Sequence, residues 1–189
     1  MDDETKMHFT SAVAQTRLAQ RRYSEALQAA ESLTDEMLTK DPEGLMGKYG
    51  TMGIAKKMLG DEAGARDAFL KAKGYAEKYV ADAPNEAKRH GRLAECLAWL
   101  GEKEAAIAEA KRGTELLPES VDAFDGPVCT QTLAEIYIIV GEYDKALEIL
   151  DGLLSRPTQV TVAQLKMNPV CDQLRQDPRF IAMLQKHGG

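Results

Sequence analysis

Four short motifs with one shared pattern recur about 40 residues apart along this 189-residue chain. The clearest copies read LGDEAGA at 59–65, LGEKEAA at 100–106 and VGEYDKA at 140–146, and a weaker copy reads AQRRYSEA at 19–26. Their closing alanines are Ala26, Ala65, Ala106 and Ala146. Regular spacing of this kind is typical of stacked repeats, in which each copy packs on its neighbours. This repeat constrains the fold more than any other feature.

Each motif lies between two amphipathic helical patterns. Its glycine stands just after the last apolar residue of the first pattern, where a helix commonly ends in the left-handed conformation. In the second copy the later pattern runs as an i, i+3, i+4, i+7 stripe from Ala65 to Ala83, directly before Pro84. Every repeat is therefore predicted to be a helix, a turn and a second helix.

These residues resemble the tetratricopeptide repeat (TPR), a 34-residue helical hairpin with large and small apolar residues at fixed places. The third copy, counted from residue 87, matches at Leu93, Ala94, Leu97, Gly101, Ala106 and Pro118, and the fourth, counted from residue 127, at Leu133, Ala134, Tyr137, Gly141, Tyr143 and Ala146. The second copy matches less fully, and the first has Arg21 in place of the glycine. The resemblance implies an all-α fold: a right-handed superhelix, or solenoid, of about four TPR-like helical hairpins plus C-terminal capping helices.

The predicted organisation is a single domain over residues 1–189, with repeats at about 7–42, 46–84, 87–120 and 127–160 and a cap at 161–187. A spacing near 40 exceeds 34 and is nearer to that of HEAT and armadillo repeats. We assign the surplus to lengthened second helices in the first two repeats, ending at Asp41 and Ala83, and to a long connection after the third. The glycine, acidic residue and alanine of the turn motif favour TPR hairpins over those alternatives.

The segment NPVCDQLRQDPRF, residues 168–180, is predicted to close the array. Asn168 and Asp177 each precede a proline, and that combination is typical of a helix N-cap followed by the first helical position. Two short helices are therefore expected, covering the last apolar face. Cys171 is interpreted as buried filler rather than a reactive thiol. Intramolecular pairing with Asp172 and Asp177 is expected for the two arginines, Arg175 and Arg179.

The same segment resembles the ends of the helical-repeat regions of multi-domain bacterial signalling proteins that carry kinase, cyclase or winged-helix regulator modules. The match lies at Pro169, Asp172, Leu174, Arg175, Asp177, Pro178, Arg179 and Phe180, and the sequence departs at Asn168, Cys171 and Gln173. This resemblance covers about residues 46–187. It implies an accessory interaction region.

Charge and cysteine content narrow the classes of partner and compartment. Thirty acidic against 24 basic residues give a net charge of −6, which repels nucleic-acid phosphates. The longest apolar run, around Ile136 to Val140, is far shorter than the roughly 20 residues that cross a bilayer. Three cysteines without C-x-x-C spacing fit a reducing compartment. For a complete chain we expect a cytoplasmic protein that neither binds nucleic acid nor inserts into a membrane.

Residue types that serve catalysis or ligand binding in other proteins are present, but they do not form a recognisable motif. His8, His90 and His187 form no metal-binding or nucleophile–base pattern. Glycines recur every third residue from 44 to 53, but without the Lys and Ser or Thr of a phosphate loop, so they are interpreted as packing or flexibility positions. No catalytic residue, metal or cofactor is predicted.

In the TPR family the first helix of each hairpin lines a concave groove that binds peptides. The residues that the resemblance places there are Ser11, Gln15, Thr51, Lys57, Lys88, Arg92, Glu95, Trp99, Gln131, Thr132 and Glu135. Trp99, the only tryptophan, is either a binding anchor or packs on the fourth repeat.

Lys88 and Arg92, with residues 89 and 90, make the one basic patch of the sequence. They match half of the clamp by which some TPR co-chaperones hold a peptide carboxylate. Ser11, Gln15 and Thr51 stand where the other half needs Lys, Asn and Asn, which argues against binding of chaperone tails. Capture of another acidic group and a plain solvated helix start both remain open.

The leading hypothesis is a non-enzymatic interaction module that holds a protein or peptide in the groove. A regulatory segment of a larger bacterial signalling protein is the first alternative, and a scaffold that self-assembles into homo-oligomers is the second.

Overall fold

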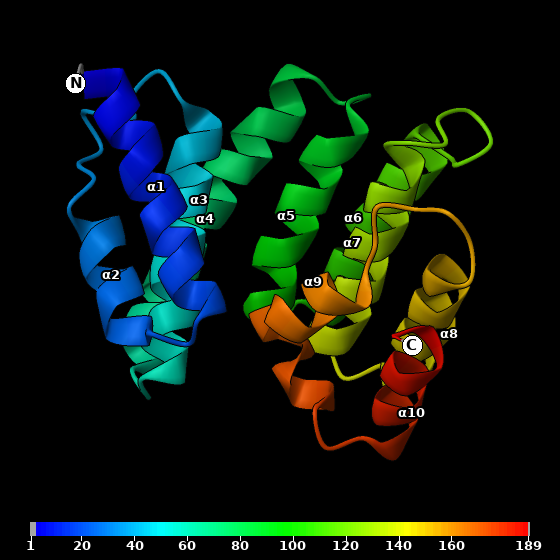
Figure 1. Cartoon of the computed structure of the whole chain (residues 1–189). Helices are drawn as coiled ribbons and strands as arrows, with labels where there is room; N and C mark the ends of the chain where they lie inside the picture. Colours follow the sequence, from blue (N-terminus) through cyan, green and yellow to red (C-terminus); the bar gives the residue numbers. More distant parts are fainter. Residues whose placement is uncertain (1–2, 189) are drawn as a thin grey trace. The chain divides into compact units, whose positions relative to one another are not determined.

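The structure, a computed structural model, describes residues 3–188, without the side chains of residues 3, 4 and 6. This part of the chain is built of helices and contains no β-strand (Figure 1). The helices are α1 (Asp3–Ala19), α2 (Tyr23–Glu31), α3 (Pro42–Met58), α4 (Glu62–Asp82), α5 (Ala87–Trp99), α6 (Lys103–Leu116), α7 (Gly126–Ile139), α8 (Tyr143–Leu154), α9 (Val162–Met167), the 3-10 helix η1 (Pro169–Leu174) and α10 (Pro178–His187). The predicted all-α class is confirmed.

The chain divides into an N-terminal unit that ends at Asp82 and a C-terminal unit that begins at Ala83. Each unit contains two pairs of successive helices in contact, α1 with α2 and α3 with α4 in the first, α5 with α6 and α7 with α8 in the second. The first helices of the two pairs also lie against each other, α1 against α3 and α5 against α7. The two units are described separately below, and the single domain expected from the sequence stays a prediction.

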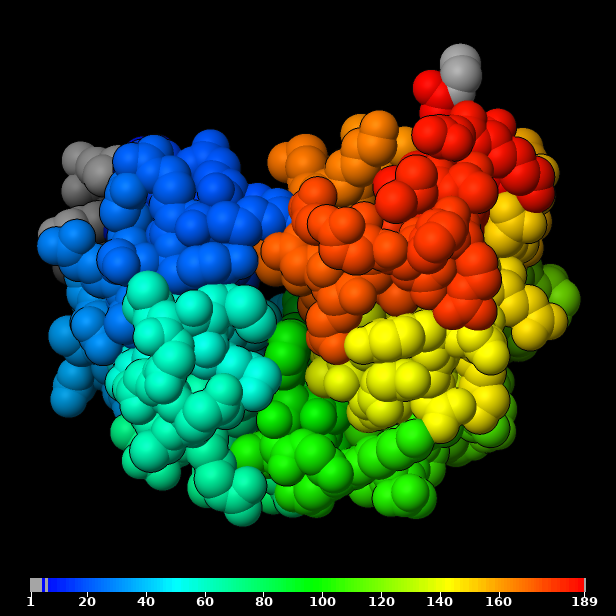
Figure 2. Space-filling view, turned by 90° about the horizontal axis from the view of Figure 1, so that it is seen from below, coloured from blue at the N-terminus to red at the C-terminus, as the bar shows by residue number. Residues whose placement is uncertain are grey.

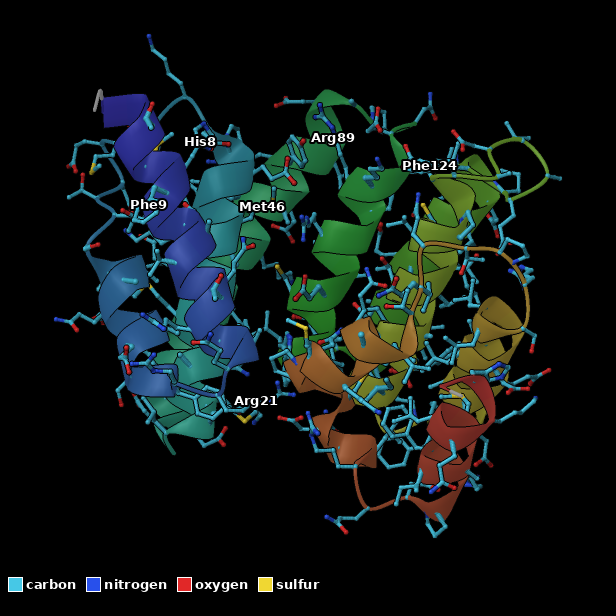
Figure 3. The ribbon with its side chains drawn as sticks, viewed as in Figure 1. His8, Phe9, Arg21, Met46, Arg89 and Phe124 are labelled. Carbon is cyan, nitrogen blue, oxygen red and sulfur yellow. The ribbon has the colours of Figure 1, made fainter. Side chains whose placement is uncertain are left out.

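One turn geometry joins the two helices of every pair. A residue in the left-handed conformation follows the first helix, with φ of 61° at Arg21, 85° at Gly60, 82° at Gly101 and 80° at Gly141. The amide after it donates to a carbonyl five residues back, at 2.8–2.9 Å in all four turns. These are the bonds of a Schellman cap, which needs a left-handed residue. The predicted left-handed turns are confirmed at the three glycines. Arg21, which replaces the glycine in the first copy and is labelled in Figure 3, adopts the same conformation although none was predicted for it.

The closing alanine of each motif lies where the second helix crosses the first. Ala26, Ala65, Ala106 and Ala146 are between 0 and 2% exposed. A methyl side chain at this point lets two helix backbones approach closely, since a larger one would meet the facing helix. The repeated motif thus encodes both a turn and a crossing point.

The second helix of the first pair is shorter than predicted. α4 continues to Asp82, as expected, but α2 ends at Glu31 and residues 32–40 form successive turns, so the prediction of a helix to Asp41 is wrong. The hydroxyls of Ser32 and Thr39 donate to backbone carbonyls at 2.7 and 3.0 Å, which offers this segment an alternative to helical bonding.

Packing also holds residues 32–40 out of helix. Leu33 and Leu38 are 2 and 1% exposed. Asp35 accepts hydrogen bonds from Lys48 Nζ at 2.5 Å and from the Tyr49 hydroxyl at 2.6 Å, both on α3. The Tyr49 ring is stacked on Tyr75 of α4, with centroids 6.0 Å apart. Contacts distant in sequence therefore outweigh the local helical pattern here.

One member of the glycine row allows a close contact. A Cβ built on Gly53 of α3 would fall 2.5 Å from the Phe69 ring of α4. The ring therefore lies directly on the α3 backbone, and the interpretation of this glycine as a packing position is confirmed.

The C-terminal cap, α9 with η1 and α10, closes the second unit as predicted. Asn168 and Asp177 are N-caps whose side chains accept from the amides of Val170 and Arg179 at 3.0 and 2.8 Å. The first predicted helix is a 3-10 helix, and α9, before it, was not predicted. Figure 2 shows the cap lying against α8. Its buried side chains join one core with α7 and α8, namely Leu165, Val170, Cys171, Leu174, Phe180 and Met183.

The ionic pairs predicted within the cap are present. Arg175 bonds Asp172, and Arg179 bonds Asp177 at 2.7 Å as well as Asp144 of α8. Both arginines thus neutralise acids of this chain, and Arg179 also joins the cap to α8.

Candidate functional site

The predicted groove residues fall into two sets, one in each unit. Ser11, Gln15, Thr51 and Lys57 belong to α1 and α3, and the other seven belong to α5 and α7. Within a unit the two helices that carry them are neighbours, as the repeat pattern requires. At Gly91 of α5 a Cβ would fall 3.2 Å from the Thr132 methyl of α7, so the helices of the second set approach closely.

The N-terminal set does not form a cluster. Thr51 is 7% exposed and belongs to the core. Lys57 pairs with Glu62 at the start of α4, with 3.0 Å between Nζ and Oε2. Ser11 is half-buried and Gln15 is exposed. The structure therefore gives no polar site built from these four side chains.

The C-terminal set contains a polar cluster, hereafter the α5–α7 cluster, made of Arg92, Glu95, Gln131, Glu135 and Asn168. Glu135 Oε1 accepts from Gln131 Nε2 and from Asn168 Nδ2, both at 2.8 Å. Arg92 lies 3.9 Å from Glu95 on the exposed side of α5. The cluster thus combines side chains from two first helices with one from the cap.

Glu135 is the electrostatic centre of this cluster. Burial, followed by the nearby negative charge of Glu95, raises its pKa from an ordinary value of 4.5 to about 7. The amides of Gln131 and Asn168 and the positive charge of Arg92 act in the opposite direction but do not offset burial. Glu135 therefore changes its charge near neutral pH.

The predicted basic patch is divided among separate partners. Lys88 Nζ lies 2.9 Å from Asp125 Oδ2, which raises the pKa of Lys88. Arg92 faces Glu95, and His90 points inward, with Nδ1 2.6 Å from Glu109 and Nε2 2.9 Å from the Pro84 carbonyl. No two of these side chains are placed to bind one carboxylate together. The structure therefore gives no support to carboxylate binding here.

Trp99 makes the packing contact that was one of its two interpretations. Its side chain is half-buried and packs on the core formed by α7, α8 and the cap. The indole is thus a structural contact between successive hairpins of the C-terminal unit.

Two partners of the predicted residues were missed by sequence reasoning. Asp125 is 37 residues from Lys88, and Asn168 is 33 residues from Glu135. Asn168 carried a signal as a helix N-cap, but no local pattern shows which side chain its amide group meets. Asp125 lies in the connection between α6 and α7 and carried no signal.

That connection presents two apolar side chains to solvent. Val121 is 74% and Phe124 70% exposed, and Figure 3 labels Phe124. The loop is nevertheless ordered by contacts, since Asp122 Oδ1 accepts from the amides of Phe124 and Asp125 at 2.8 Å and Glu119 bonds Thr130. The two side chains offer apolar area that a partner could bury on a loop that is already ordered. Because Asp125 pairs with Lys88, this surface adjoins the start of α5.

Among the described side chains, no three of His, Cys, Asp or Glu are arranged to hold a metal ion. The three thiols are buried, as predicted for Cys171, and burial raises the pKa of Cys129. A buried thiol of raised pKa is a poor nucleophile.

In the same described part of the chain, no helix has both the length and the apolar character of a bilayer-spanning segment.

No protein-family model matches the chain, and no curated protein sequence matches it. The TPR resemblance therefore stays a prediction from the residues.

Proposed function

We propose that the chain is a non-enzymatic interaction module that binds a protein or peptide segment on the face made by α5 and α7. The proposal includes a TPR-like arrangement, in which four hairpins stack as a right-handed solenoid. Its main support is the turn geometry shared by all four helix pairs, because identical turns at regular spacing generate stacked hairpins. The net charge of −6 favours a protein partner over nucleic acid.

The surface offered to the partner is mixed in charge. Lys88 and Arg92 are exposed on α5, and Glu95 lies beside them. The α7 half, with Gln131 and Glu135, is partly covered by Asn168. The partner is therefore expected to contact α5 and the adjoining Phe124 more extensively than α7.

The test compares two matched charge reversals in pull-downs from the source cells. The face variant carries Lys88→Glu and Arg92→Glu. The control carries Lys111→Glu and Arg112→Glu on α6, where both side chains are exposed and Arg112 faces Glu115 at 3.7 Å, much as Arg92 faces Glu95. Helix content of both variants is checked by circular dichroism.

A partner retained by the wild type and the control but lost by the face variant supports the proposal, and Phe124→Ser should weaken the same partner. Equal loss or equal retention in the two charge reversals would place recognition elsewhere on the chain. Mass that rises with protein concentration in sedimentation would favour the self-assembling scaffold instead.

A further inference from the structure

The exposed side of α1 carries no Asp, Glu, Lys or Arg among the side chains described there. Its exposed residues are Thr5, His8, Phe9, Ala12, Gln15 and Thr16. The six exposed residues of α6, four of them charged, are Glu104, Ala105, Ala108, Lys111, Arg112 and Glu115. Charged residues commonly cover the solvent side of a helix, whereas the central parts of protein interfaces are depleted of charge. The exposed side of α1 therefore has the composition of an interface.

Phe9 and Ala12 occupy the middle of this side. Phe9 is 62% exposed, more than any other large apolar side chain described in the N-terminal unit, and Figure 3 labels it on α1. Ala12 is exposed one turn further along, and its methyl group lets another helix approach α1 closely. In a two-fold pair, the large side chain of each chain can pack beside the small residue of the other.

The sequence has opposite charge at the two ends of α1. Residues 2–6 contain three acids and one lysine, a net charge of −2, and residues 17–25 contain three arginines and one acid, a net charge of +2. The one acid, Glu25, has carboxylate oxygens 2.6 Å from Arg22 Nε and 3.4 Å from Arg17 Nε, so one negative charge is shared at this positive end. A helix that lies antiparallel on α1 would bring its first turn to this end, and acidic residues are favoured in a first turn.

A second copy of α1 meets this requirement, because its own first residues are acidic. In an antiparallel pair with Ala12 opposite Ala12, residue 3 of each chain lies opposite residue 21 of the other, and Phe9 lies opposite Gln15. The same arrangement sets the two helix dipoles antiparallel, which is favourable. A two-fold axis repeats every contact, so the pair is closed.

We propose that the exposed side of α1 is a homodimer interface, in which the α1 helices of two chains pair antiparallel about Ala12. A helix of 17 residues is about 25 Å long, so one helix pair belongs with the smaller and weaker interfaces. The contact does not use α5 or α7, so it goes beyond the proposed function and leaves the proposed binding face free. It also ends at two chains, whereas a self-assembling scaffold would keep growing.

The experiment measures the mass of the full chain by sedimentation equilibrium from about 20 μM to about 1 mM, a range suited to a small interface. The mass should rise from one chain toward two and stop there. Phe9→Glu should weaken the pairing about tenfold or more, because it places a charge in the centre of the contact. Leu70→Glu is the matched control, since Leu70 is 44% exposed on α4 of the same unit, and it should associate as the wild type does. Circular dichroism checks the helix content of both variants.

A charge exchange tests the antiparallel arrangement. Arg21→Glu with Arg22→Glu makes both ends of α1 acidic, and Asp3→Lys with Glu4→Lys makes both ends basic. Each double variant alone should dimerise about tenfold more weakly than the wild type. In an equal mixture every acidic end meets a basic end, so dimers should return, and a fluorescent label on one variant shows that they contain both.

A wild-type chain that remains single at the highest concentration, or a Phe9→Glu variant that associates as the wild type does, would overturn the dimer. Mass beyond two chains would overturn the closed pair, and a mixture that does not recover would overturn the antiparallel arrangement. Failure of the α1 pair leaves the proposed binding function standing, and failure of the pull-down leaves the α1 pair standing.

Discussion

The N-terminal unit fastens residues 32–40 to α3 through Asp35, whereas the C-terminal unit fastens the cap to α7 through Glu135. Hydrogen bonds from Lys48 and then Tyr49 lower the pKa of Asp35. Burial raises the pKa of Glu135, and its direct hydrogen-bond donors are neutral amides. The fold therefore shifts the pKa values of these two carboxyl groups in opposite directions.

The difference shows that the partner of a carboxyl group matters as much as its position in the fold. An ammonium donor on a partly exposed carboxylate favours the charged form, while amide donors on a desolvated one do not compensate for lost hydration. Asp35 is thus a permanent ionic link at neutral pH. Glu135 is a link whose charge varies there.

The largest expected effect concerns a feature that residues 32–40 and the C-terminal cap share. Each has a leucine side chain buried in the core of its unit. Leu38 in residues 32–40 is 1% exposed and Leu174 in the cap is 0% exposed. Leu38→Ala and Leu174→Ala should each lower the free energy of unfolding by about 3 kcal/mol, through lost burial and a cavity. Denaturation followed by circular dichroism measures both changes.

Trp99, the only tryptophan, lies in the C-terminal unit, so its fluorescence reports that unit alone. Leu174→Ala should shift the fluorescence transition and Leu38→Ala should not. A loss below about 1 kcal/mol in either variant would contradict the anchoring role.

The pH dependence of the C-terminal unit is the next largest effect. Because the pKa of Glu135 is higher in the folded than in the unfolded chain, its contribution to stability is complete below pH 4.5 and is lost as pH rises through about 7. The side chain is only half-buried, so we expect a loss of about 2 kcal/mol between pH 5 and 8. Urea denaturation followed by Trp99 fluorescence measures it. Glu135→Gln should remove this slope, and an unchanged slope would assign it to another group.

In the N-terminal unit, the ionisation of Asp35 makes stability fall as pH decreases, the reverse of the effect of Glu135. The lowered pKa of Asp35 contributes stability above its ordinary value of 3.8, and that stability is lost as pH falls below it. Lys48→Met removes the ammonium donor and should cost about 1.5 kcal/mol at pH 7, because Asp35 is partly exposed. Thermal unfolding at pH 7 and at about pH 2.5 should show the difference between variant and wild type shrinking in acid.

Lys71→Met is the control for that variant. Lys71 lies over the same Tyr49 ring, 5.1 Å from its centroid, but no hydrogen bond joins it to Asp35. It should cost under about 1 kcal/mol, with little change in acid. Equal effects of the two lysine variants would assign the stabilisation to the ring rather than to the carboxylate.

The smallest expected effect concerns the turns. Arg21 holds φ of 61°, a conformation in which a non-glycine residue is strained. Arg21→Gly should therefore stabilise the N-terminal unit by about 1 kcal/mol, whereas Gly101→Ala should destabilise the C-terminal unit by a similar amount. Thermal melts of both variants test this. A destabilised Arg21→Gly would show that contacts of the arginine side chain outweigh its backbone strain.

The sequence by itself determined the helical class, the four turns and the caps of the C-terminal segment. Gly60, Gly101 and Gly141 adopt the predicted left-handed conformation, and Asn168 and Asp177 cap helices as expected. These features follow from sequence because each depends on a few neighbouring residues, whose backbone preferences and reachable hydrogen bonds are set within one turn of chain.

Tertiary structure alone decided where α2 ends and which distant side chains meet those of α5 and α7. Lys88 meets Asp125 and Glu135 meets Asn168 across more than 30 residues, and Asp35 holds a segment out of helix through α3. Such partners follow from how whole helices pack, and burial then sets the charge of each group. A local sequence pattern shows neither the packing of distant helices nor the burial of a side chain. The repeat could therefore be predicted from the residues, whereas the charge of Glu135 at neutral pH depends on the folded chain.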